Sequence, residues 1–177
     1  MLLSSRASVL RNLLIICALG LAGNVAVAAG SVPPKQPEAA LACTVTSVHD
    51  GDTLRARCKG MSKTVRVRID QIDAPELDQA AGLASRDHLR RLCQRGESVQ
   101  LAVLGKDQYG RLLADARCNN QDVAAAQLKS GHAWVYTRYL RDSRLKTYEH
   151  DAKTQKRGLW KDHDPKPPWQ FRYDQRH

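Results

Sequence analysis

Five charged residues in the middle of the chain are of the types that phosphate chemistry uses. They are Asp52, Arg68, Asp73, Glu76 and Arg111. Each alone has an ordinary structural explanation, because carboxylates are common in turns and caps and arginines are common on solvated strand faces. Together they supply oxygen ligands for a hard cation, a proton acceptor and two phosphate-binding groups.

The spacing suggests a chemical role for each of these groups. Asp52 and Asp73 offer carboxylate oxygens, which suit Ca²⁺ or Mg²⁺ better than zinc. Glu76 follows Asp73 by three residues, so it can share that site and accept a proton from an attacking water. Arg68 and Arg111 can hold phosphate oxygens from two sides. Because arginine stays protonated, Arg111 is interpreted as an electrostatic stabiliser and not as a general acid.

Three motifs that contain these residues also resemble a known family. "VHDGDTL", "VRVRIDQIDAPE" and "KDQYGR" are similar, in order and spacing, to motifs of the staphylococcal nuclease (thermonuclease) family. "GHAWVYTRY" and "KRGLW" extend the resemblance over about residues 43–160. The resemblance implies a nuclease that uses one Ca²⁺ ion to hydrolyse DNA, RNA or both, leaves 3′-phosphate ends and is built on an oligonucleotide-binding (OB) barrel.

The resemblance also assigns roles to individual residues. It implies metal ligands at Asp52, Asp73 and the Ala74 carbonyl, catalytic groups at Arg68, Glu76 and Arg111, and substrate contacts at Tyr109 and Tyr139. Ala74 departs from the threonine that family members often carry, but a carbonyl ligand survives that change. Gln108 replaces a lysine that can help to hold a substrate phosphate.

The local pattern around Asp52 predicts a tight hairpin. Asp50-Gly51 is a preferred two-residue turn, and it would place Asp52 for cation binding, with Asp50 in a supporting role. An EF-hand loop is excluded, because its closing glutamate would fall at Met61 or Lys63. His49 is not assigned as a base, since it has no orienting partner in the pattern.

The periodicity predicts an α+β domain. Strands are expected at 43–48, 53–58, 64–73, 98–104 and 111–118, and helices at roughly 79–95, 122–131 and 143–158. The strand 64–73 loses its alternation at Gln71, as a β-bulge would cause. In a strand, Trp134 and Tyr136 would lie on the same face, and both are expected in the core. Five short strands with three helices predict a small OB-fold-like barrel.

The ends of the chain have different compositions. Residues 1–28 resemble a cleavable signal peptide, with Arg6 and Arg11 as their only charges and "AVA" before the expected cleavage point. A flexible tether at 29–42, a nuclease-like domain at 43–161 and an extended tail at 162–177 are expected to follow. An exported protein, periplasmic or secreted and without a stable membrane anchor after cleavage, is therefore predicted.

The charge of the chain favours an anionic partner. The net charge is +10, and removal of the two arginines of the signal leaves +8 on the remaining 149 residues. A surplus of this size in one small domain favours nucleic acid or acidic lipid as the partner. No protein partner is implied.

Four cysteines remain after cleavage, and export favours disulfides. In a hairpin with a two-residue Asp50-Gly51 turn, Cys43 and Cys58 face one another. Cys93 and Cys118 then pair by elimination. The absence of a Cys-x-x-Cys pair from the sequence disfavours a zinc cluster.

Two alternatives remain open at this point. A nucleic-acid-binding barrel without catalysis would explain the charge and the fold equally well. An envelope interaction protein that uses its Pro-rich ends is the other. Simple binding has no need of three carboxylates, which repel phosphate, and this favours the nuclease.

Overall fold

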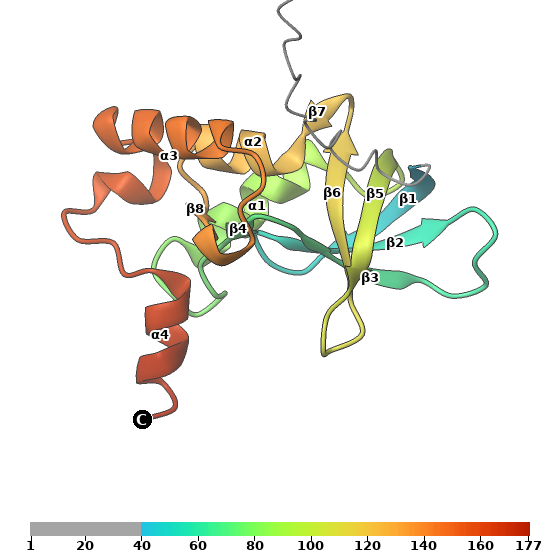
Figure 1. The fold of residues 1–177 in the computed structure, drawn as a ribbon, viewed down its shortest axis with the longest axis horizontal. Coiled ribbons are helices and arrows are strands. Elements are labelled where there is room, and N and C mark those ends of the chain that lie inside the picture. Colours follow the sequence, from blue (N-terminus) through green and yellow to red (C-terminus); the bar gives the residue numbers. More distant parts are fainter. Residues whose placement is uncertain (1–39) are drawn as a thin grey trace, which may run out of the picture. The chain divides into compact units, whose positions relative to one another are not determined.

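A five-stranded barrel forms the centre of the computed structural model, which describes residues 40–177. Its strands are β1 (Leu41–Val48), β2 (Thr53–Cys58), β3 (Val65–Ile69), β5 (Ser98–Lys106) and β6 (Leu112–Cys118). They pair in the order β3-β2-β1-β5-β6, and β6 returns to pair with β3 in parallel, which closes the barrel (Figure 1). The predicted OB-fold-like α+β architecture is confirmed. The predicted signal peptide and most of the predicted tether lie outside the described residues.

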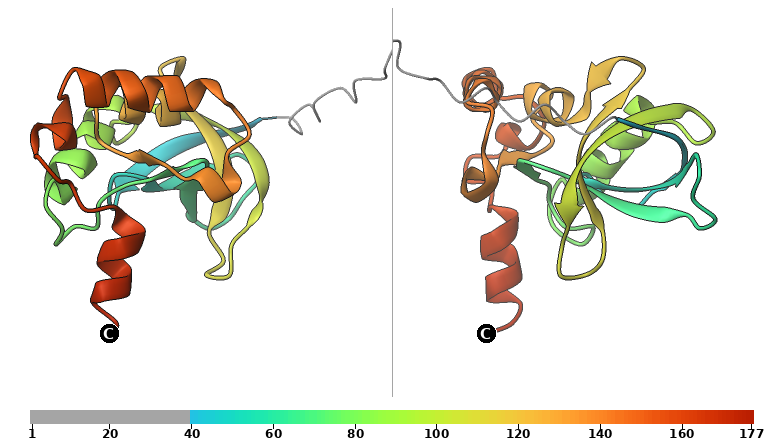
Figure 2. Two further views of the ribbon diagram at one scale, coloured as in Figure 1. Left: turned by 60° about the vertical axis from the view of Figure 1, so that its left-hand side comes forward. Right: turned by 45° about the vertical axis from the view of Figure 1, so that its right-hand side comes forward.

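The helices gather on one side of this barrel, and the last one extends away from it (Figures 1 and 2). They are α1 (Gly82–Leu92), α2 (Val123–Lys129), α3 (Arg144–Thr154) and α4 (Pro168–Asp174), with short 3₁₀ turns at Thr137–Tyr139 and Gly158–Lys161. Two-residue strands complete the fold: β4 (Ile72–Asp73), β7 (Gln121–Asp122) and β8 (Trp134–Val135). In the described part of the chain, no helix has the length and apolar character needed to cross a bilayer.

The prediction of an extended tail at 162–177 is wrong, because α4 lies within it. Pro168 occupies the first turn of this helix, where a proline sacrifices no hydrogen bond. The tail therefore contributes a fourth helix, and its side chains reach the candidate site described below.

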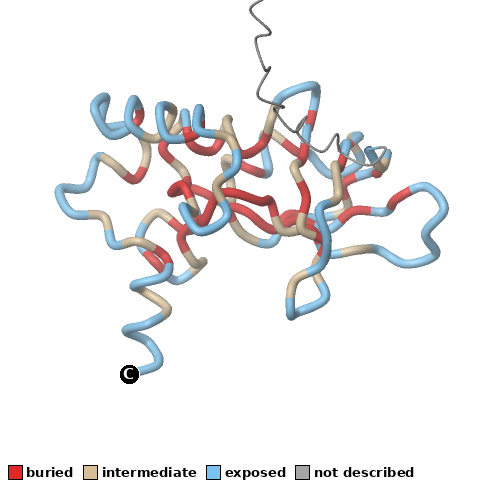
Figure 3. The backbone as a smooth tube through the Cα atoms, in the orientation of Figure 1, coloured by how far each residue is buried: buried red, intermediate tan, exposed pale blue. Residues whose placement is uncertain are grey.

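Alternating strand residues fill the barrel, as the sequence pattern predicts. Leu54, Val67 and Leu101 are completely buried, and Leu89 of α1 and Leu128 of α2 cover the barrel from the helical side. Figure 3 shows this buried centre in red and most of α4 in pale blue. Burial of a side chain of this size contributes roughly 1.5–3 kcal/mol, so the core holds the strands whereas α4 depends on other contacts.

Both disulfides connect the predicted partners. Cys43 and Cys58 join β1 to β2, and Cys93 joins the end of α1 to Cys118 at the end of β6. The second bridge encloses the longer segment, with a sequence separation of 25 against 15.

The predicted two-residue turn at Asp50-Gly51 is wrong, although the cysteine register that rested on it is right. Val48 lies opposite Leu54, one residue out of the register that pairs Cys43 with Cys58, because β1 contains a bulge between Val45 and Ser47. The amides of residues 49 and 50 both donate to the carbonyl of residue 53. The loop therefore has three residues, 50–52, and the bulge restores the register farther along the strand.

The break in alternation at Gln71 is also not a β-bulge. Strand β3 ends at Ile69, and Gln71 adopts a left-handed backbone with φ 67° before β4 begins. The chain turns out of the barrel here, and β4 pairs with β8 instead. This turn carries Asp73 away from the barrel sheet and toward the helical side.

Candidate active site

Asp52 lies directly before β2 and is held by several hydrogen bonds. Its carbonyl accepts a hydrogen bond from the Ile69 amide of β3 at 2.8 Å. Its carboxylate accepts one from the Thr53 hydroxyl at 3.0 Å and one from the Ala74 amide at 2.8 Å. The residue is only 5% exposed. The side chain of Asp52 therefore ties the first motif of the sequence directly to the second.

Gly51 is required here because of close packing. A Cβ atom at this position would overlap Ser85 of α1 and would lie 2.7 Å from the Cβ of Ala74. Gln127 of α2 donates a hydrogen bond to the Gly51 carbonyl. The loop that carries Asp52 is thus pressed against two helices and cannot shift independently.

Asp73 ends β4 and is 2% exposed. Arg68 of β3 donates to Asp73 Oδ1 at 3.1 Å, and its other terminal nitrogen lies 3.1 Å from Asp52 Oδ2. One guanidinium therefore bridges both carboxylates that the sequence proposes as metal ligands. Ala74 follows Asp73 directly and is buried beside them.

Glu76 lies on the same side of the cleft but is paired with a residue that the sequence did not single out. Arg172 of α4 donates to Glu76 Oε1 at 2.7 Å and to Asp73 Oδ2 at 2.8 Å. Nothing in the sequence pattern pointed to Arg172, since its partners lie 96 and 99 residues earlier in the chain.

Arg111 enters from the opposite side of the cleft. The Asp107 carboxylate forms a 2.7 Å ion pair with Arg111 Nε and accepts a hydrogen bond from the Arg111 backbone amide. One terminal nitrogen of Arg111 lies 3.4 Å from the Thr53 hydroxyl. Its guanidinium carbon stands 5.6 Å from the ring centre of Tyr109, which is 64% exposed. Asp107 was present in the quoted "KDQYGR" motif, but its orienting role is visible only in the structure.

Two tyrosines line the other wall. Tyr136 and Tyr139 meet edge to face, with ring centres 5.0 Å apart. The prediction that Trp134 and Tyr136 share a core-facing strand face is wrong, because β8 ends at Val135 and a 3₁₀ turn follows. Trp134 is buried, with its ring 5.1 Å from that of Trp160, whereas Tyr136 lines the cleft.

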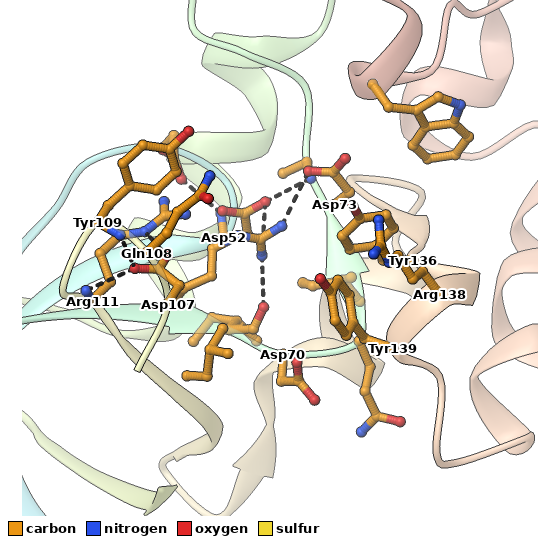
Figure 4. Close-up of a pocket in the computed structure, with 18 of the residues that line it drawn as sticks. Asp52, Asp70, Asp73, Asp107, Gln108, Tyr109, Arg111, Tyr136, Arg138 and Tyr139 are labelled. Atoms are coloured by element: carbon orange, nitrogen blue, oxygen red, sulfur yellow. Dashed lines mark hydrogen bonds and ion pairs between the residues drawn. The ribbon is translucent and has the colours of Figure 1, made fainter. Parts of the chain in front are cut away.

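These side chains surround one open cleft of about 990 Å³. In Figure 4, the loop that carries Asp107, Gln108, Tyr109 and Arg111 lies on one side, Tyr136, Arg138 and Tyr139 lie on the other, and Asp52 and Asp73 lie between them. Every site residue proposed from the sequence, apart from the cysteines, lines this cleft. The structure thus brings together residues that are up to 87 positions apart in the chain, from Asp52 to Tyr139.

Comparison with known proteins assigns the family. Residues 66–162 match the model of the staphylococcal nuclease homologue family. The chain belongs to this family. The predicted resemblance is therefore confirmed, and α4 lies beyond the matched region.

Several proteins are similar to this family member over about two thirds to three quarters of its length. An "Uncharacterized endonuclease" of Escherichia coli is 38% identical over 130 residues, which cover 73% of this chain and 83% of that protein. An "Uncharacterized endonuclease" of Haemophilus influenzae has the same identity, with 72% of its length covered. The "Probable staphylococcal-like nuclease CAN3" of Oryza sativa is 40% identical over 116 residues, but the chain spans only 30% of its length.

The carboxylates at the centre of the cleft fit a cation site. Asp52, Asp73 and Glu76 lie together and pair with two guanidinium groups, those of Arg68 and Arg172, whereas Arg111 and further basic side chains line the rest of the cleft. Burial, and then the charge of Asp52, raises the pKa of Asp50 to about 7. Burial also raises the pKa of Asp73, although the hydrogen bond from Arg172 opposes this. Both shifts arise mainly from burial, which disfavours the charged form of a carboxyl group, and the charge of Asp52 adds to them.

The donor set determines the kind of ion that would suit this site. Within residues 40–177, no three His, Cys, Asp or Glu side chains are grouped closely enough to hold a metal. A metal here would rest on Asp52, Asp73, the Ala74 carbonyl and water. An all-oxygen, partly hydrated shell of this kind is typical of Ca²⁺ and Mg²⁺.

Proposed function

We propose that this family member is an exported nuclease that uses one calcium ion to hydrolyse phosphodiester bonds of DNA, RNA or both. The observation that carries the proposal is the convergence of Asp52, Asp73, Glu76, Arg68 and Arg111 on one open cleft. A barrel that only bound nucleic acid would gain nothing from buried carboxylates that repel phosphate. Family membership supports the same reaction class.

Each side chain has a separate role in the proposed reaction. Glu76 accepts a proton from the attacking water as the water oxygen bonds to phosphorus. Arg68 and Arg111 hold the phosphoryl oxygens as negative charge builds up on them. Calcium held by Asp52, Asp73 and the Ala74 carbonyl would withdraw charge from the same phosphoryl group.

The products follow from which bond breaks. We propose that the bond from phosphorus to the 5′ oxygen is cleaved, so the phosphate remains on the 3′ oxygen. The departing 5′ oxygen takes a proton from solvent, because Arg111 does not release its own. Tyr109 and Tyr139, both exposed at the rim, would contact the nucleotides beside the cleaved bond.

The main experiment incubates the purified full-length protein with single-stranded DNA, duplex DNA and RNA, in calcium or in excess chelator. We expect cleavage in calcium, loss of cleavage in chelator, recovery on re-addition, and weaker support by Mg²⁺, which demands stricter octahedral geometry. Products should accept a 5′ phosphate directly but should be extended by a polymerase only after phosphatase treatment. Full activity in chelator would refute the calcium dependence.

A matched pair of variants tests the base. Glu76→Gln removes the proton acceptor but keeps the side-chain shape, and it should lower turnover by about 10²–10⁴-fold. Glu97→Gln serves as the control, because the Glu97 side chain accepts a hydrogen bond from Asn119 outside the cleft. Binding of nucleic acid without cleavage by the unaltered protein would favour the binding barrel. Neither binding nor cleavage would favour the envelope interaction protein.

Export is proposed from the signal-like sequence of residues 1–28. We expect the protein recovered from its native compartment to begin at Ala29, which N-terminal sequencing or intact-mass measurement would test. Recovery of the uncleaved chain from the cytoplasm would contradict export without touching the nuclease proposal.

A further inference from the structure

Arg172 occupies the part of the cleft where the proposed chemistry needs free carboxylate oxygens. One of its terminal nitrogens lies 2.8 Å from Asp73 Oδ2, and the other lies 3.3 Å from Asp73 Oδ1 and 2.7 Å from Glu76 Oε1. This forked contact to two carboxylates is among the stronger side-chain interactions that a protein forms. A single guanidinium therefore binds a proposed metal ligand and the proposed base together.

These contacts are incompatible with the proposed roles of the two carboxylates. Arg68 contacts Asp73 Oδ1, and Arg172 binds the other oxygen, Oδ2, so with Arg172 in place both oxygens of this proposed metal ligand accept hydrogen bonds. Glu76 Oε1 accepts a hydrogen bond from Arg172, so Arg172 occupies the oxygen that would receive a proton from water. The arrangement that retains Arg172 is thus a closed form of the site.

The segment that carries Arg172 is weakly attached elsewhere. Helix α4 has seven residues, and Pro168 is the only one of them that is buried. Its other polar ties are a 2.6 Å bond from Gln79 to the Lys166 carbonyl and a 3.1 Å bond from Gln175 to Asp78. A helix this short is marginal without partners, so the ion pairs of Arg172 are its main anchor.

We propose that α4 is an internal competitor of the divalent cation, and that Arg172 must leave Asp73 and Glu76 before the site can bind calcium and act. The inference rests on the proposed function, since it assigns a closed state to that same site. Calcium and α4 would compete for the same carboxylates. The apparent association constant for calcium would then equal the intrinsic constant multiplied by the fraction of molecules in which α4 is undocked.

Trp169 supplies a signal for the position of α4. Its ring lies parallel to that of Tyr136, with centres 6.4 Å apart and planes inclined by 11°, and the residue is 40% exposed. Of the other two tryptophans, Trp134 is buried and Trp160 is half-buried. We expect undocking of α4 to change the emission of Trp169, and a Trp169→Phe variant identifies that component.

The experiment measures calcium binding to full-length protein by calorimetry in the absence of nucleic acid. Arg172→Gln should bind calcium about 3–10-fold more tightly than the unaltered chain, as expected if α4 is docked in most molecules. Gln175→Arg adds a charged partner for Asp78 and should weaken calcium binding instead. Arg144→Gln removes an equal charge from an exposed pair with Asp142 and should leave the affinity unchanged.

The fluorescence titration adds an independent result. Calcium should shift the Trp169 emission of the unaltered chain, and Arg172→Gln should show the shifted emission before calcium is added. Equal calcium affinities in the unaltered chain and Arg172→Gln, or a Trp169 signal that saturating calcium does not move, would overturn the competition while leaving a calcium-dependent nuclease intact. Failure of every variant to bind calcium, together with no cleavage of nucleic acid, would overturn the proposed function and this inference with it.

Discussion

Arg68 and Arg172 bind the same carboxylate, Asp73, but they belong to different kinds of structure. Arg68 projects from a central barrel strand, its side chain is 12% exposed, and it also contacts Asp52 and the Ile69 carbonyl. Arg172 projects from a terminal helix of seven residues, and its side chain is 37% exposed. The same guanidinium–carboxylate chemistry is a fixed part of the site in one case and a removable occupant in the other.

What separates the two arginines is the number of interactions that must break together. Moving Arg68 would disrupt the pairing of Thr53 with Arg68 in the sheet and the bond from Ile69 to the Asp52 carbonyl. Moving Arg172 breaks its own ion pairs and a few contacts of a short helix. Local opening draws on regions with little burial, and α4 is such a region.

The largest expected effect on activity comes from replacing each of the two arginines, Arg68 and Arg172, with lysine. Arg68→Lys should lower turnover by about 10²–10³-fold, because an ammonium group cannot reproduce a forked contact to phosphate. Arg172→Lys should act in the opposite direction and raise activity at limiting calcium, because lysine cannot bridge Asp73 and Glu76. Initial rates across a calcium titration would measure both. A loss of turnover in both variants would erase the distinction between the arginines.

The same division explains how much could be predicted from the sequence. The barrel strands, the two disulfides and the convergence of the charged motifs could be predicted because alternation and motif order are local signals that the core reinforces. The bulge in β1 and the left-handed Gln71 could not, since the bulge offsets the three-residue loop against β2 and Gln71 turns the chain out of the barrel between β3 and β4. Helix α4 carries no such pattern, and the contacts of Arg172 that anchor it are almost a hundred residues distant in the chain.

Removal of the disulfides should weaken the barrel but not the competition at α4. In the chain-entropy model the Cys93–Cys118 bridge contributes ~3.5 kcal/mol and the Cys43–Cys58 bridge ~3 kcal/mol to the free energy of unfolding. Paired Cys→Ala variants, unfolded in urea, would measure each contribution. At temperatures where each paired Cys→Ala variant is still folded, adding Arg172→Gln should tighten its calcium binding as it does in the unaltered chain. If that difference vanished, the docking of α4 would depend on the disulfides of the barrel, which would contradict the view that α4 opens independently of the barrel.

The smallest effects concern Asp50, which lines the cleft, and His132, which follows α2, because their pKa shifts have opposite signs. Burial, and then the nearby His88, lowers the pKa of His132 from 6.5 to about 4. The ring of His132 stacks on that of His88, with centres 4.5 Å apart. Asp50 shifts the other way, from 3.8 to about 7. Both shifts act mainly between pH 4 and pH 7.

The direction of each contribution follows from which state binds more protons. Between pH 6.5 and about 4 the unfolded chain protonates His132 more than the folded chain does, so this residue makes stability fall as the pH falls. Between pH 3.8 and about 7 the folded chain protonates Asp50 more than the unfolded chain does, so this residue makes stability fall as the pH rises. These two contributions oppose one another in the unaltered protein.

Single substitutions should therefore expose opposite slopes. In excess chelator, relative to the unaltered protein, His132→Gln should make the slope of stability against pH more negative and Asp50→Asn should make it more positive, each by at most ~1.4 kcal/mol per pH unit. Urea unfolding at pH 4.5, 5.5 and 6.5 would measure both slopes. Arg172→Gln in the same series should change neither sign, because Arg172 has no contact with His132 or Asp50 in the described structure. Changes of slope in the same direction in the two variants would show that the folded protein does not keep Asp50 protonated and His132 neutral, as their burial requires.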